Sequence, residues 1–234
     1  MAQATADGSR LGFFAALYQR VTAAIREGIR AGLFEDGPRM ERLDVTFANR
    51  YLAALERFGR GEAPGECWGV AFRAASRWRP IIVQHLLLGM NAHINFDLGI
   101  AAAQTCPGTA LAGLRGDFEK INDILAAQVP RVMGEMGQLS PWIGWLDRID
   151  PKAEVALINF SIDKARAYAW KLAARLAALG QDEWGPELAG VDAEMALLGA
   201  LIEKPVGVVF RLGLGLIRAR ECGDVRRVMG VLGG

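Results

Sequence analysis

The sequence predicts an all-α fold, a single-domain bundle of helices around one buried central helix at about residues 80–105. Apolar residues recur every three or four positions along almost the whole chain, which is the spacing of one helix face. Alternating runs rich in Val, Ile and Thr, which would predict strands, are nearly absent. Turns that contain Pro or Gly divide the chain into about nine helical segments.

The turns place the helices in order. Asp36-Gly37-Pro38, Arg79-Pro80 and Cys106-Pro107-Gly108 are typical, because proline lacks a backbone N–H and glycine tolerates turn conformations. No connection is long enough to separate domains, so residues 1–234 are expected to form one domain. The predicted ranges are 9–32, 38–59, 65–77, 80–105, 109–136, 141–148, 151–179, 187–203 and 206–231, the last of which a break at Gly223 would divide.

The charge balance excludes several classes of partner. The 234 residues include 27 basic and 26 acidic side chains, for a net charge of +1, and the basic residues are scattered. Such a chain has no field that would attract a nucleic-acid backbone or an anionic membrane surface. We expect no nucleic-acid partner and no membrane insertion, and the sequence leaves a homo-oligomer open.

The cysteines and the first residues favour a cytoplasmic protein. Cys67, Cys106 and Cys222 are odd in number and far apart, which suits a reducing compartment. The start MAQATADGSR lacks the apolar run of a signal peptide. The best apolar stretch, residues 206–217, is interrupted by Arg211, so no membrane span is expected.

The segment RPIIVQHLLLGMNAHINFDLGIAAA holds both histidines of the chain and is apolar almost all round. At about 100° per residue, one stripe of the helix carries His85, Gly89, His93 and Asp97. A second polar stripe on roughly the opposite side carries Asn91 and Asn95. Unsatisfied polar atoms in a core are costly, so either neighbouring helices or a cavity must provide partners for both stripes.

The pair His93 and Asp97, one turn apart, suits two kinds of chemistry. A carboxylate beside an imidazole fixes its tautomer and raises its pKa, which prepares a general acid or base. Alternatively, both side chains could bind one divalent metal ion, although no cofactor is required. Gly89 leaves room for a packed helix or a bound molecule. The competing interpretation is that these polar residues only satisfy one another in the core.

The helix at 38–59 is predicted to supply a second polar group. Phe47 and Tyr51 lie on its apolar stripe, and Asp44 falls in the middle of that stripe rather than at its edge. A buried carboxylate must be paired, protonated or bound to a metal, and His85, His93 and Arg50 are its candidate partners. Arg50 itself lies off the stripe and is expected to be a capping or surface residue.

From these residues we expect an enzyme with a closed, apolar cavity between the helices at 38–59, 80–105 and 109–136. His93 would act as acid or base, Asp97 would orient it, and Asp44 or His85 would be the second proton-transfer group. The expected substrate is a small, mostly apolar molecule that undergoes cyclisation, isomerisation, hydration or hydrolysis. Its binding residues would be Gly89, Asn91, Asn95, Phe47, Tyr51 and Asn122. The alternatives are a protein that binds an apolar ligand without altering it and a helical interaction module.

The strings FEDGPRMERLDVTFANRYLAAL, QHLLLGMNAHINFDLGIAA, DFEKINDILAA and SPWIGWLDRID resemble a bacterial family catalogued only as a domain of unknown function. The resemblance covers nearly the whole chain, and HLLLGMNAHINFDLG is its most specific stretch. It implies no activity, but it places within the family's motifs the residues His85, Asn91, His93, Asn95, Asp97, Asp44, Asn49 and Arg50.

His93 and Asp97 are also loosely similar to the HxxxD pair of the all-helical zinc phospholipase C and nuclease group. The chain has only two histidines, too few for the trinuclear site of that group, so this similarity implies no activity.

Overall fold

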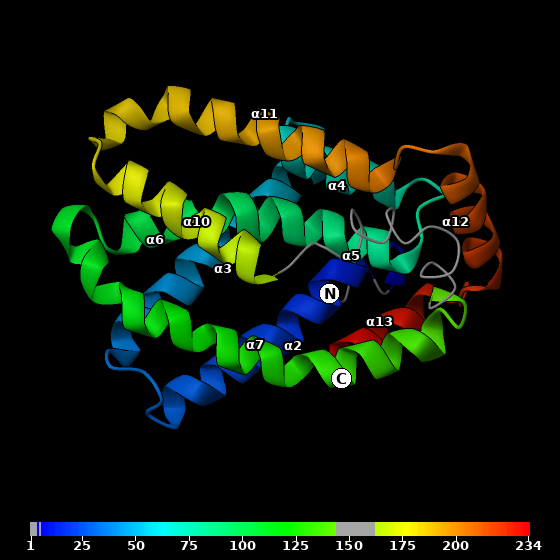
Figure 1. Ribbon diagram of the computed structural model, residues 1–234, viewed down its shortest axis with the longest axis horizontal. Helices are drawn as coiled ribbons and strands as arrows, with labels where there is room; N and C mark the ends of the chain where they lie inside the picture. Colours follow the sequence, from blue (N-terminus) through cyan, green and yellow to red (C-terminus); the bar gives the residue numbers. More distant parts are fainter. Residues whose placement is uncertain (1–3, 5, 144–161) are drawn as a thin grey trace.

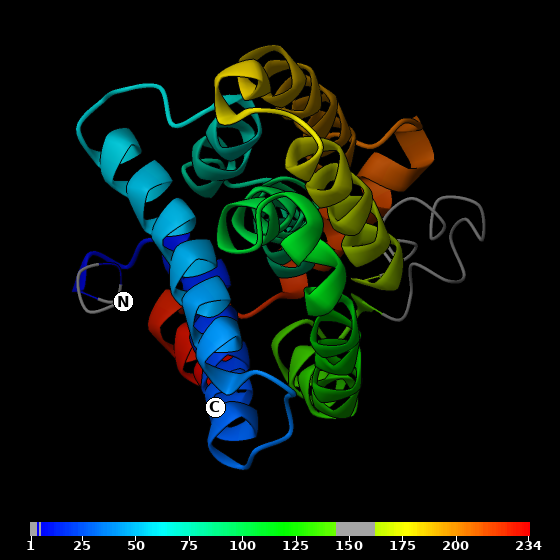
Figure 2. The same ribbon diagram turned by 90° about the vertical axis from the view of Figure 1, so that its left-hand side faces the viewer.

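The computed structural model describes residues 4, 6–143 and 162–234, which form helices and contain no strand. The all-α prediction is therefore confirmed for this part of the chain. Figure 1 shows long helices packed around α5 and α6, and Figure 2 shows the same central helix almost end-on, with neighbours on every side. The longer helices are α2 (Leu11–Arg30), α3 (Gly37–Gly59), α7 (Leu111–Leu139), α10 (Ile162–Ala177) and α11 (Trp184–Glu203). The shorter ones are α4 (Glu66–Ala75), α12 (Val208–Arg220) and α13 (Val225–Gly233), with the single turns η2 (Gly108–Ala110) and η4 (Gln181–Glu183).

The predicted helix at 80–105 is continuous but changes its winding. It consists of α5 (Ile82–Met90), the π-helical turns η1 (Asn91–Asp97) and α6 (Leu98–Thr105). Its side chains enter all four apolar clusters found among the described residues, through residues such as Phe96, Leu98, Leu88 and Leu86. This helix is therefore the centre of the bundle, as the sequence predicted.

The central helix also corrects one expectation. Ile82–Thr105 is long and apolar enough to cross a membrane, with 24 residues and a mean hydropathy of 1.2. Contrary to the expectation from sequence, residues 206–217 are therefore not the best apolar stretch of the chain. Because 89% of the most apolar part of this helix is buried inside the protein, the other helices cover its apolar surface. It has the environment of a core helix rather than of a lipid-exposed span.

Turn residues define several helix ends in the way the sequence suggests. The Asp36 carboxylate accepts a hydrogen bond from the backbone N–H of Arg39, and Pro38 lies in the first turn of α3. Asp224 caps α13 in the same way, through the N–H groups of Arg226 and Arg227. The predicted helix at 206–231 is divided there into α12 and α13. The predicted helix at 141–148, apart from its first three residues, and the start of the one at 151–179 lie outside the described residues.

Candidate functional site

The π-helical turns of η1 carry most of the polar residues that the sequence selected. A π-helix is rare and is frequently found at functional sites. Here, it interrupts a buried helix between Asn91 and Asp97. Both predicted pairs form within it, since His93 contacts Asp97 and Asn95 contacts Asn91. The site thus begins with an unusual backbone segment at the centre of the fold.

Asp97 is a buried carboxylate with three donors. Its Oδ1 accepts a hydrogen bond from Arg50 Nε at 2.8 Å, and its Oδ2 accepts one from Trp68 Nε1 at 2.9 Å. His93 Nδ1 lies 3.3 Å from the same Oδ2. The Asp97 side chain is only 2% exposed, whereas that of Arg50 is 25% exposed. Residues from α3, α4 and η1 therefore fix the carboxylate, and through it one edge of the imidazole.

His93 is enclosed by aromatic rings. Its imidazole stacks on Phe47 with a centroid distance of 3.5 Å and an interplanar angle of 5°. The edge-to-face contact with Tyr18 has a centroid distance of 4.6 Å. The ring centroids of Phe14 and Tyr51 lie 5.7 and 6.0 Å from that of His93. The ring centroid of Trp68 also lies 6.0 Å from that of His93. We call Phe14, Tyr18, Phe47, Tyr51 and Trp68 the aromatic cage.

The environment of His93 keeps the ring neutral. Burial lowers the pKa of His93, and this effect outweighs the opposing hydrogen bond and charge of Asp97. Because a carboxylate only accepts hydrogen bonds, the proton of the neutral ring belongs on Nδ1. The other nitrogen, Nε2, is buried and has no hydrogen-bond partner. His93 thus has one nitrogen oriented by Asp97 and one with a free lone pair.

A second group of polar atoms lies between α2 and α3. The hydroxyl groups of Tyr18 and Thr22, one turn apart on α2, are both buried. Burial raises the pKa of Tyr18, and the nearby negative charge of Asp44 raises it further. Asp44 is half-buried, as the sequence indicated, and burial raises its pKa to about 6 although the charge of Arg26 opposes this. Arg50, one of the three candidate partners of Asp44, binds Asp97 in the structure.

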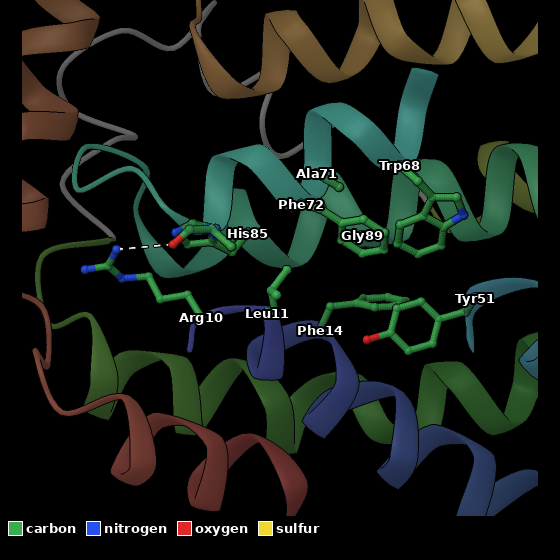
Figure 3. A pocket seen from close by; sticks show the side chains of 10 residues that line it. Arg10, Leu11, Phe14, Tyr51, Trp68, Ala71, Phe72, His85 and Gly89 are labelled. Carbon is green, nitrogen blue, oxygen red and sulfur yellow. Dashed lines mark hydrogen bonds between the residues drawn. The ribbon is translucent and has the colours of Figure 1, made fainter. Parts of the chain in front are cut away.

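Three rings of the cage also line a small cavity. Figure 3 shows Phe14, Tyr51 and Trp68 at one end of it and Arg10 and His85 at the other. The cavity volume is about 20 Å³, which is enough for about one water molecule. The expectation of a space large enough for a substrate is therefore not met by this cavity.

Gly89 makes room for a packed helix rather than for a ligand. A Cβ atom on Gly89 would lie 2.4 Å from Cγ of Phe14. The absence of a side chain on α5 thus allows α2 to bring Phe14 against the central helix. The sequence left open whether Gly89 makes room for a packed helix or for a bound molecule, and the structure shows a packed helix.

His85 lies apart from the pair. It faces the Arg10 end of the cavity and makes an edge-to-face contact with Phe13 at 5.7 Å. Burial and the charges of Arg10 and Arg218 lower the pKa of His85 to about 3. Its Nε2 is also buried without a hydrogen-bond partner. The described contacts do not join His85 to Asp44 or to Asp97.

The two asparagines face α11. Asn95 Nδ2 donates to Asn91 Oδ1 at 2.9 Å, and Asn91 Nδ2 donates to the carbonyl oxygen of Met195 at 2.7 Å. Both side chains are buried. The second polar stripe is therefore satisfied by a neighbouring helix.

The helix at 109–136 was expected to form one wall of the site, but the described ring contacts with His93 come from other helices. Asn122, on α7, accepts a hydrogen bond from Arg166 of α10. The walls around His93 come instead from α2, α3 and α4, which contribute the aromatic cage. Sequence periodicity shows that a helix has an apolar face, but it does not show which other helix that face contacts.

Sequence reasoning missed three members of the site, Trp68, Tyr18 and Phe14, and it named Arg50 only as a candidate partner of Asp44. Arg50 had one available signal, because it lies three residues after Phe47 and one before Tyr51 and so flanks the apolar stripe of α3. A buried Asp97 also requires donors. Nothing in the sequence indicated that Trp68 of α4 would be one of them.

The residues around His93 do not fit the divalent metal ion of the alternative hypothesis. The Asp97 oxygens already accept hydrogen bonds from Arg50 and Trp68. Within residues 4, 6–143 and 162–234, no group of three His, Cys, Asp or Glu side chains is placed to hold a metal. No step is therefore assigned to an ion.

The fold and the site define a class: an all-α protein with a caged His–Asp pair on a π-helical segment of its central helix. The chain belongs to a family of unknown function (DUF5995), whose model matches residues 1–205. This range includes the central helix and every residue of the aromatic cage. No curated protein and no solved structure matches the chain.

Proposed function

We propose that this protein is an enzyme that moves a proton on a small, mostly apolar molecule, with His93 as the general acid or base. The observation that carries the proposal is the difference in hydrogen bonding between the two nitrogens of the His93 ring. Nδ1 faces Asp97, while Nε2 is buried without a partner. This is the arrangement that a proton-transferring histidine needs, with a carboxylate that fixes its tautomer.

The energetic cost of the arrangement supports this role. A buried polar atom without a hydrogen bond costs about 1–3 kcal/mol, so a purely structural histidine would be expected to satisfy Nε2. The π-helical segment is a second departure from the most stable local structure. Both departures fall on the same residue pair, as expected where stability is given up for function.

Asp44 is the better of the two predicted candidates for the second proton-transfer group. With its pKa raised to about 6, it can exchange protons with solvent near neutral pH. Its charge acts on Tyr18, and the Tyr18 ring contacts the imidazole of His93. His85, with its pKa lowered to about 3, stays neutral in the same range.

The site is closed, and this restricts the substrate. Around His93 the walls are aromatic, so they favour an apolar body. Because the cavity of about 20 Å³ holds only about one water molecule, the rings that line it must separate before a substrate enters. Phe14 lies both in the cavity wall and in the cage, so its movement would open the cavity towards His93. Cyclisation, isomerisation, hydration and hydrolysis all remain within this chemistry.

The experiment is a comparison of metabolite turnover. A small-molecule extract is incubated with the wild-type protein, with His93→Phe and with Asn122→Ala, and changes are followed by untargeted mass spectrometry. We expect compounds that the wild type and Asn122→Ala convert and His93→Phe does not. Equal conversion by His93→Phe would contradict the proposal. The Asn122 variant is the matched control, because the sequence placed this residue in the site and the structure does not.

A second candidate, in which the polar groups only fix the packing of the core, is favoured by the closed cage. In that case His93→Phe should lose stability without any loss of turnover or of ligand binding. A small molecule that copurifies with the protein and is released unchanged would instead indicate a binding protein. Native mass spectrometry detects this outcome.

The cellular location belongs to the same proposal. Cys67, Cys106 and Cys222 are all free, with the first two buried, which supports a reducing compartment such as the cytoplasm. Burial raises the pKa of the Cys67 thiol, so we assign this cysteine no nucleophilic role.

A further inference from the structure

The end of the molecule formed by α12 has an unusually apolar surface. Seven of the exposed large apolar side chains lie between residues 197 and 216, within a short part of the chain. In Figure 1, α12 turns away from α11 and covers one end of the bundle. We call these side chains the α12 face; they are Leu197, Leu201, Val206, Val208, Val209, Leu212 and Leu216.

Individual side chains of the α12 face are highly exposed to solvent. Val206 is 83% exposed and Leu212 is 66% exposed. The opposite side of α12 is packed, since Phe210, Leu214 and Ile217 belong to an apolar cluster of the core. Thus α12 has apolar residues on both sides. The residues on its inward side pack α12 against the core, but packing does not explain why apolar residues also lie on its exposed outward side.

The charges around the α12 face are basic. From residue 204 to residue 220 the charged side chains are one Lys and three Arg, with no Asp or Glu. Lys204, Arg211 and Arg220 are exposed, whereas Arg218 is buried. The neighbouring Glu203 forms an ion pair with Arg77 and so adds little free negative charge. The net charge of +1 for the whole chain conceals this local excess.

An exposed tryptophan lies on the flank of the same helix. Arg218 Nε donates to the carbonyl oxygen of Trp78 at 2.8 Å, and the guanidinium lies 5.5 Å from the Trp78 ring. The Trp78 side chain is 59% exposed. Tryptophan is enriched where an apolar phase meets water, because its ring is apolar and its N–H is polar.

We propose that the α12 face binds to the surface of an anionic membrane. The apolar side chains would enter the boundary between headgroups and acyl chains, and the basic side chains would contact anionic headgroups. This combination of apolar and basic residues favours a lipid surface over a second copy of the chain, because two such faces would bring their basic residues together. The proposal is independent of the chemistry assigned to His93.

The test uses the full-length protein and vesicles of phosphatidylcholine with about 30% phosphatidylglycerol. Co-sedimentation is expected with these vesicles and not with vesicles of pure phosphatidylcholine. Raising the salt concentration from about 0.05 to about 0.5 M should weaken binding, because it screens the headgroup charges. The double variant Leu212→Glu/Leu216→Glu should reduce binding by about tenfold or more, since it puts charges where exposed apolar side chains would enter the membrane.

Val45→Glu/Leu52→Glu provides the matched control. These α3 side chains are 53% and 54% exposed, close to the 54% of Leu216, but they lie outside the α12 face. Binding by this variant should equal that of the wild type, and circular dichroism checks that both variants remain folded. Two results would overturn the proposal: no binding to anionic vesicles, or a concentration-dependent dimer that Leu212→Glu/Leu216→Glu abolishes without any vesicle binding by the wild type.

Discussion

A substitution of Asp97 is expected to disturb the fold as well as the function, whereas a substitution of His93 can change the function alone. Asp97 accepts hydrogen bonds from Arg50 and Trp68, so its removal would leave both donors unpaired. His93 contributes mainly a flat ring stacked on Phe47. Its Nε2 contributes no hydrogen bond within the described protein. Substitutions at residue 93 are therefore the more informative ones.

His93→Phe is predicted to leave stability nearly unchanged and to abolish function. Phenylalanine preserves the stacked ring and removes an unsatisfied nitrogen, while the contact with Asp97 Oδ2 is lost and Trp68 still donates to that oxygen. We expect the free energy of unfolding to change by less than about 1 kcal/mol. Urea denaturation measures this change. A loss of about 3 kcal/mol or more would show that the imidazole is a structural element of the core.

Gly89→Ala is predicted to destabilise the protein although alanine is the better helix former. The new methyl group would lie 2.4 Å from Cγ of Phe14, a buried ring that lines the cavity and the cage. The gain in helix propensity is about 1 kcal/mol, and the cost of overpacking is about 1–3 kcal/mol. We expect a net loss of up to about 2 kcal/mol and a change in the Phe14 resonances in NMR spectra. Gly134→Ala on α7, where no atom lies within 4 Å, should not be destabilising.

At the scale of elements, short polar connections fix how the helices meet. Asp117 of α7 accepts hydrogen bonds from the backbone N–H groups of Glu35 and Asp36 at 2.7 and 3.1 Å and from Arg39 Nη2 at 2.9 Å. This carboxylate holds the turn before α3, and α3 carries Arg50 and Phe47 to the site. The position of the cage therefore depends on a contact far from it in the sequence.

Asp117→Asn is predicted to lower the free energy of unfolding by about 3 kcal/mol. The asparagine amide cannot accept hydrogen bonds from all three donors, and the ion pair with Arg39 is lost. Burial alone would raise the pKa of Asp117, but these hydrogen bonds and the Arg39 charge lower it below its ordinary value. Its contribution is thus present at neutral pH and is lost as the pH falls through the lowered pKa. Thermal and urea unfolding at pH 7 measure the effect.

The control for this prediction is Asp123→Asn, which changes an exposed carboxylate on the same helix. It should alter the free energy of unfolding by no more than about 0.5 kcal/mol. Equal effects of the two substitutions would contradict the role given to Asp117.

Prediction of the elements from sequence was most successful where proline and glycine mark their ends. Residues 38–59 and 80–105 match α3 and the central helix within two residues. The π-helical winding of η1 could not be predicted, because it shifts the helix register by less than one turn and leaves the apolar pattern intact. The partners of Asp97 could not be predicted either, since Arg50 and Trp68 come from two other helices.

For the whole molecule, buried titratable groups of opposite sign shape the dependence of stability on pH. Burial raises the pKa of Glu221 to about 7, although hydrogen bonds to Ile82 and Arg218 oppose this. The folded protein then binds a proton that the unfolded chain has released, so this group makes stability fall as pH rises from about 4.5 to 7. His85, with its pKa lowered to about 3, has the opposite effect, and stability falls as pH drops below about 6.5.

The variant Glu221→Gln is predicted to become more stable, relative to the wild type, as the pH rises. Glutamine can still accept the hydrogen bond from the Ile82 N–H but needs no charge in a side chain that is 0% exposed. Relative to the wild type, its free energy of unfolding should increase by about 1–3 kcal/mol between pH 5 and pH 8. Urea denaturation of both proteins at the two pH values tests this. A constant difference would mean that Glu221 is ionised in the folded protein at both.

The sequence by itself determined the all-α class, the central position of residues 80–105 and the pairing of His93 with Asp97. These features follow from local rules, since a residue and its neighbour four positions away share a helix face whatever surrounds them. The tertiary structure alone decided that α2, α3 and α4 enclose the imidazole and that Arg50 and Trp68 hold the carboxylate. It also decided that Asn122 faces another helix. Such contacts depend on how apolar faces from distant segments fit together, and the spacing of residues along a single helix carries no information about that fit.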